Sequence, residues 1–144
     1  MAIDRFILEK VSETKLPGLS IAAVRDGKVV YSEEVVWEPR DNPDPNYHFQ
    51  EILRALQTAA SKLPRVDAIG GSSAGIIIDN RPMVASLFRS IPQNRFDEVK
   101  SLFGRLQVAM GVPLVVINDG DVTALAGSMS LEDNAVLGIA MGSS

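Results

Sequence analysis

Residues Gly111–Gly127 read GVPLVVINDGDVTALAG, and this stretch decides the fold of the chain. The aliphatic run Pro113–Ile117 has the β-branched composition of a strand that is covered on both faces. The turn formers Asn118-Asp119-Gly120-Asp121 end that strand, and the small residues Val122–Gly127 suit a closely packed helix. In open α/β sheets, ligands bind beyond the carboxyl ends of the strands. Asp119 stands at such an end and is therefore the first candidate for a functional residue.

A β-hairpin is predicted upstream of this stretch, with strands over Ile21–Val24 and Val29–Trp37. An Asp-Gly pair joins them, and this pair is a strong hairpin signal because both residues accept positive φ. The proline-rich stretch Glu38–Asn46 predicts a loop. Met1–Lys15 is ambiguous between strand and helix, and Phe6-Ile7-Leu8 favours a further strand.

Helical and extended patterns alternate through the rest of the chain. Apolar residues at helical spacing predict two helices, and short apolar runs predict three strands besides Pro113–Ile117. The helices are Tyr47–Leu63 and Asn94–Met110, and the strands are Val66–Gly70, Ile76–Ile78 and Ala135–Met141. A hairpin followed by this alternation predicts an α/β protein with a mixed β-sheet and flanking helices, in a single domain over residues 1–144.

Composition excludes several classes of function. A net charge of −4 argues against a nucleic-acid-binding surface, which usually carries a basic stripe. The chain has no cysteine, so thiolate metal sites and disulfides are excluded. No apolar run is long enough for a membrane span or a secretory leader. We therefore expect a cytoplasmic protein with no membrane partner.

A serine motif is the second candidate site. Gly71–Gly75 (GSSAG) matches the G-x-S-x-G pattern of a hydrolase nucleophile elbow, with Ser73 at its centre. That elbow needs a helix after it and a catalytic histidine further along the chain. Ile76-Ile77-Ile78 is a poor helix start, and the chain's one histidine, His48, precedes the motif. The pattern therefore favours a tight glycine loop. His48 and the one tryptophan, Trp37, are expected to cover the edge of the core.

Two polar stretches remain open in their interpretation. Asp119 is either a routine helix cap or a carboxylate that takes a proton from a substrate hydroxyl. Asn118, Asp119 and Asp121 together offer more acceptors than one cap uses. At the other stretch, Gly142-Ser143-Ser144 offers backbone N–H groups and hydroxyls that suit phosphate oxygens, or else it is a frayed end. One histidine leaves no convincing metal site.

Three segments taken in order, VDAIGGSSAGIIIDN, GVPLVVINDGDVTALAG and VLGIAMGSS, resemble the ROK family of sugar kinases and related repressors. This family belongs to the actin, hexokinase and Hsp70-like ATPases, so the resemblance implies a ribonuclease H-like, actin-like ATPase lobe. It also implies ATP and Mg²⁺ as cofactors, a sugar as substrate and Asp119 as general base. By the same resemblance, the residues on the sugar side are Asn118, Ser72, Ser73 and Gly75, and those near the nucleotide phosphates are Gly142, Ser143 and Ser144.

The resemblance leaves two functions open. The family opens with an Asp-x-Gly-Gly-Thr phosphate loop, and the comparable stretch Lys10–Lys15 lacks the Asp and the paired glycines. By this resemblance, the chain looks like the N-terminal lobe of a two-lobe kinase, which we expect to be inactive alone. The alternative is a non-catalytic sugar-sensing or interaction module with a degraded phosphate loop. A homodimer is also expected if apolar surface is exposed.

Overall fold

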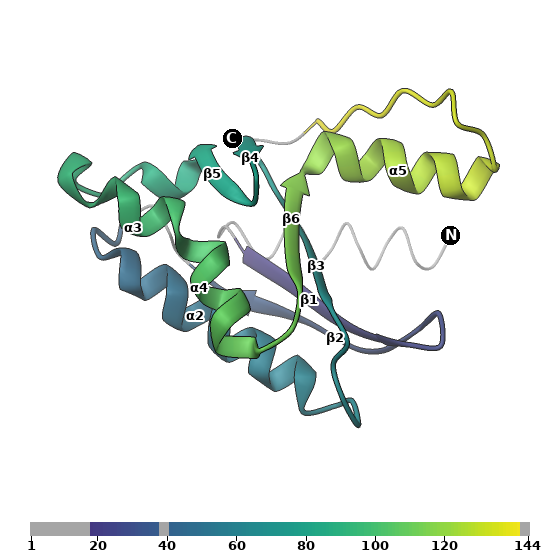
Figure 1. The fold of residues 1–144 in the computed structure, drawn as a ribbon, viewed down its shortest axis with the longest axis horizontal. Coiled ribbons are helices and arrows are strands. Elements are labelled where there is room, and N and C mark those ends of the chain that lie inside the picture. The colour runs from purple at the N-terminus through teal and green to yellow at the C-terminus, as the bar shows by residue number, and fades with distance from the viewer. Residues whose placement is uncertain (1–17, 38–40, 142–144) are drawn as a thin grey trace.

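The computed structural model describes residues 18–37 and 41–141. The expected strand at Phe6-Ile7-Leu8 lies outside the described residues. The predicted hairpin is confirmed as β1 (Gly18–Arg25) and β2 (Lys28–Val36), which pair antiparallel (Figure 1). Its turn residues Asp26 and Gly27 have φ values of 51° and 72°, the left-handed pair that a tight hairpin turn requires.

Helix α2 (Pro45–Ala60) confirms the first predicted helix, with shifted ends. It begins two residues early because the Asp44 side chain caps it, accepting from the Asn46 N–H at 3.1 Å, and Pro45 suits the first turn. It ends at Ala60, after which the chain forms a turn. Its apolar stripe packs on the core through Phe49, Ile52, Leu53 and Leu56.

The described strands form three two-stranded sheets, whereas the sequence pattern predicts one mixed sheet. β3 (Ile69–Ser73) pairs in parallel with β6 (Leu114–Asn118), and β4 (Ile76–Ile78) pairs antiparallel with β5 (Arg81–Val84). β1 and β3 do not pair with each other. The protein is thus a mixed α/β structure with an N-terminal hairpin. The prediction of a single sheet is wrong because the alternation of the sequence specifies where strands form but not which strands pair.

The predicted helix over residues 94–110 is divided into α3 (Phe96–Lys100) and α4 (Leu102–Met110). The division falls at Ser101, whose φ and ψ are −88° and −1°. Its hydroxyl donates to the Glu98 carbonyl at 3.0 Å. A serine that bonds a nearby carbonyl competes with regular helix geometry, which accounts for the break. Short 3₁₀ turns at Ser86–Phe88 and Gln93–Arg95 precede α3.

The core lies between α4, β6 and the segment that follows β5. Leu102 and Leu106 of α4 are each 1% exposed, and Leu114 of β6 is 2% exposed. Val115, between the two buried residues of β6, is 58% exposed. The prediction that this strand is covered on both faces is therefore wrong, because helices cover only one face of the β3–β6 pair in the described structure.

The last described element is α5 (Asp119–Leu131), which starts directly where β6 ends. The predicted strand over Ala135–Met141 is wrong: these residues form no strand and run back along α5 (Figure 1). At Gly138 an added Cβ would collide with the backbone of Ala124. Contact with the helix thus replaces pairing with a strand edge. None of the described helices is long and apolar enough to cross a membrane.

His48 is fully buried and packs between two aromatic rings. Its ring centroid is 5.6 Å from that of Trp37 and 5.8 Å from that of Tyr47. Burial lowers the pKa of His48, since a charged imidazole is poorly solvated there. This placement confirms a structural role for His48, deeper in the core than the predicted edge position.

Candidate functional site

The carboxyl ends of the two parallel strands meet at one edge of their sheet. In the register of β3 and β6, Ser73 is the partner of Asn118. The Gly75 turn follows β3, and Asp119 follows β6 as the first residue of α5. Residues 72–75 and 118–119 therefore lie at the same edge of this sheet.

Asn118 holds this edge together through both ends of its side-chain amide. Its Oδ1 accepts from the Gly120 N–H at 2.8 Å, which caps α5. Its Nδ2 donates to the Gly75 carbonyl at 2.6 Å, across 43 residues of sequence. The amide is thus engaged with the protein at each end, and it positions the turn after β3 against the start of α5.

Gly75 occupies a position that no other residue can take without strain. Its φ is +116°, and an added Cβ would collide with the Val84 carbonyl oxygen and lie 3.0 Å from the Ala85 Cα. The turn after β3 therefore passes directly against the end of β5. This close approach keeps the Gly75 carbonyl in reach of Asn118.

Asp119 is half-buried in the first turn of α5. Its Oδ1 lies 3.0 Å from the Gly120 N–H, and its backbone carbonyl accepts from the Thr123 hydroxyl at 2.9 Å. Asp121 in the same turn is exposed. Asp119 is therefore the more sheltered of the two carboxylates at this edge.

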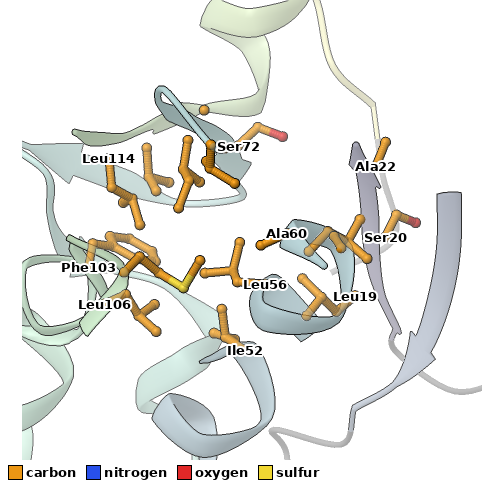
Figure 2. Close-up of a pocket in the computed structure, with 18 of the residues that line it drawn as sticks. Leu19, Ser20, Ala22, Ile52, Leu56, Ala60, Ser72, Phe103, Leu106 and Leu114 are labelled. Atoms are coloured by element: carbon orange, nitrogen blue, oxygen red, sulfur yellow. The ribbon is translucent and has the colours of Figure 1, made fainter. Parts of the chain in front are cut away.

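A cavity of about 540 Å³ lies beside this edge, with Ser72 and Ser73 in its lining. Figure 2 shows Ser20 and Ala22 of β1 on one side of it and Ser72 of β3 across from them. Its floor is apolar and comes from α2, α4 and β6. Asp119 does not line this cavity. The cavity and the sheet edge that carries Asp119 are thus neighbouring but separate features.

The hydrolase interpretation finds no support at Ser73. A nucleophile elbow requires a helix directly after the serine, but β4 follows here. The Ser73 hydroxyl donates to the adjacent Ala74 carbonyl at 3.3 Å. His48 is enclosed in the core. Among the described residues, no group of three His, Cys, Asp or Glu side chains could hold a metal ion. Gly142, Ser143 and Ser144 lie outside the described residues.

Asn80 is a structural residue that sequence reasoning missed. Its Nδ2 donates to the Leu114 carbonyl at 2.9 Å, and its Oδ1 accepts from the Val116 N–H at 2.7 Å. The side chain thus pairs with β6 as a further strand would. The sequence does contain a signal for the β4–β5 hairpin, because Asp79-Asn80 between two apolar runs favours a two-residue turn with positive φ. The observed φ values of these two residues are 49° and 62°.

Comparison of the chain with protein-family models, curated proteins and solved structures finds no match.

Proposed function

We propose that this chain is the N-terminal lobe of an ATP-dependent sugar kinase of the ROK type, which transfers the γ-phosphate to a sugar hydroxyl with Asp119 as the general base. The supporting observation is the single edge at which β3 and β6 end, with Ser73 opposite Asn118 and Asp119 next in the chain. In parallel α/β sheets this edge is where ligands bind. The proposed fold of the lobe is ribonuclease H-like, which agrees with a hairpin, a helix and a parallel strand pair in that order.

In the proposed reaction, Asp119 accepts the proton of a sugar hydroxyl as its oxygen becomes the nucleophile. A positioned carboxylate of this kind contributes a factor of about 10²–10⁴ in rate. ATP with Mg²⁺ would supply the phosphoryl group. Among the described residues, no group of three His, Cys, Asp or Glu side chains could hold a metal ion. We derive only the sugar side, where Asn118 orients the Gly75 turn and the exposed Ser72 would be available to a sugar.

The first experiment is an NMR titration of the protein with a panel of aldohexoses and their N-acetylated amino forms. We expect amide shifts at Ser72, Ser73, Gly75 and Asp119, and none at the β1–β2 turn. If no sugar shifts these amides, or if the shifts gather elsewhere, the proposal is wrong. Sugar binding without phosphorylation by the full-length gene product would instead support the non-catalytic sensing module.

The second experiment tests the base in the full-length gene product. Asp119→Asn keeps the shape of the side chain but removes its basic oxygen. We expect it to lower kcat by a factor of about 10²–10⁴ while the KM for sugar changes little. Asp121→Asn is the matched control, because it removes an exposed carboxylate from the same helical turn. Equal losses of kcat in the two variants would contradict the role of Asp119.

A further inference from the structure

A second hollow, a groove of about 810 Å³, lies between α4 and the turn that joins β4 to β5. Its lining comes from residues 79–81 of that turn, from residues within 100–109 of α3 and α4, and from Phe49 of α2. Neither Asn118 nor Asp119 lines this groove. What the groove binds is therefore independent of the proposed kinase reaction.

The groove is cationic, although the chain carries a net charge of −4. Arg81, Lys100 and Arg105 line it, and they face one carboxylate, that of Asp79. In the part of the chain that the structure describes, neither Arg81 nor Arg105 forms an ion pair. The Lys100 Nζ lies 3.8 Å from Oδ1 of Asp97, whose side chain is 93% exposed. Such exposed pairs contribute little, so all three cations are available to an anionic ligand.

The Arg105 side chain is held in place without a ligand. Its Cζ lies 4.2 Å from the centroid of the Phe49 ring, and its Nη2 donates to Asn46 Oδ1 at 3.3 Å. The carboxylate of Glu98, on the preceding helix, is engaged with Arg95 through two hydrogen bonds of 2.7 Å and 2.9 Å. A guanidinium that stacks on an aromatic ring keeps its other N–H donors in a fixed plane. Arg105 is therefore preorganised to bind a phosphate group.

Gly104 leaves room in the groove above α4. A glycine within a helix is less favourable than alanine, and no atom lies within 4 Å of a Cβ added to Gly104, so close packing does not require this glycine. Next to it in the lining, Gln107 accepts from the Leu114 N–H through Oε1 at 3.1 Å, which leaves its Nε2 amide to donate to a ligand. Val108 is 82% exposed and adds apolar surface to the same groove.

We propose that this groove binds a small phosphate monoester, with Arg105 as the anchor of the phosphate group. Arg81 and Lys100 supply further positive charge, and Phe49 and Val108 contact the organic part of the ligand. Three cations against one carboxylate favour a dianion over a monoanion, and the apolar part of the lining favours an ester over free phosphate. The volume of the groove lies within the range of small-molecule sites, about 300–1,000 Å³.

An NMR titration of the full chain with phenyl phosphate, inorganic phosphate and phenol tests the site, at constant neutral pH and ionic strength. We expect saturable amide shifts at residues 79–81 and within residues 100–109, and none with phenol. Phenyl phosphate should bind at least about five times more tightly than inorganic phosphate, because its ring buries apolar surface in the groove. The absence of saturable shifts with phenyl phosphate, or shifts at residues 72–75 and 118–119 instead, would overturn the proposal. Equal affinities for the two phosphates would overturn the assignment to a monoester.

Two variants with a matched control locate the phosphate group. Arg105→Gln should weaken the binding of phenyl phosphate by about tenfold or more, because it removes charge-assisted hydrogen bonds. Arg89→Gln is the control, since Arg89 is exposed and does not line the groove, and it should weaken binding by less than about twofold. Gly104→Leu keeps every charge and suits the helix better than glycine does, but its side chain would occupy the groove, so it should also weaken binding by about tenfold or more. Equal affinities in the Arg105 and Arg89 variants, or undiminished binding in Gly104→Leu, would overturn the proposal.

Discussion

Replacement of Gly75 by alanine tests whether the close approach at the turn after β3 controls the candidate site. The alanine Cβ would collide with the Val84 carbonyl oxygen, at a φ of +116°. The backbone strain costs about 1–3 kcal/mol, and forcing a methyl group into packed space costs about 1–3 kcal/mol more. We therefore expect Gly75→Ala to lower the free energy of unfolding by roughly 2–6 kcal/mol.

Gly111→Ala is the matched control for this variant. Gly111 ends α4 with a φ of +68°, and no atom lies within 4 Å of an added Cβ. That substitution carries only the cost of left-handed backbone, about 1–2 kcal/mol. The two variants should thus differ by about 2 kcal/mol, the contribution of the collision alone.

Urea unfolding followed by circular dichroism measures this difference. With m of about 1–3 kcal/mol/M for a small protein, the midpoint of Gly75→Ala should fall about 0.7–2 M below that of Gly111→Ala. The Asn118 side-chain amide resonance should also move in Gly75→Ala alone, because that amide donates to the Gly75 carbonyl. Equal midpoints, with an unmoved Asn118 resonance, would refute the reasoning that the turn is held by close packing.

Three further predictions concern the core and the sheet edge. Burial lowers the pKa of His48 below its ordinary value, so below about pH 6.5 the unfolded chain binds more protons at this histidine than the folded protein does. Urea midpoints should therefore fall as the pH drops below about 6.5, and His48→Leu should flatten this dependence. Asn80→Gly keeps the positive φ but removes both side-chain hydrogen bonds to β6. It should lower the free energy of unfolding by about 1–3 kcal/mol and speed hydrogen exchange at the Val116 amide. An unchanged exchange rate would contradict the role of Asn80 in holding β6. Leu106→Ala should lower the free energy of unfolding by about 2–5 kcal/mol. Val108→Ala, at an 82% exposed position of the same helix, should lower it by less than about 0.5 kcal/mol. Similar losses in the two variants would contradict the placement of the core on α4.

Local chemistry made several features of this protein predictable. The Asp-Gly pair sets the hairpin turn through positive φ at both residues. The run Pro113–Ile117 predicts a strand, which the structure shows as β6 (Leu114–Asn118). Asn118 then caps α5, accepting from the Gly120 N–H two residues further along the chain. Each of these depends on residues close together in the chain, so the pattern itself contains the interaction.

The candidate site was predictable only in part. The sequence placed Asp119 at a strand end and Ser73 in a glycine loop, and the parallel register of β3 and β6 brings both to one edge. The bond from Asn118 to the Gly75 carbonyl joins residues that are 43 positions apart. A local pattern cannot specify such a bond, because it depends on which strand β6 chooses as its partner.

The sequence by itself determined the order of strands and helices, the turn chemistry and the apolar faces, because φ preference, capping and side-chain periodicity act within a few residues. Only the tertiary structure decided which strands pair, that Ala135–Met141 lies against α5, and that Asn80 closes the edge of β6. Those outcomes depend on how faces distant in the chain fit together. Hydrophobic burial drives the faces together without direction, whereas the hydrogen bonds and close contacts that select one arrangement form only once the chain is folded.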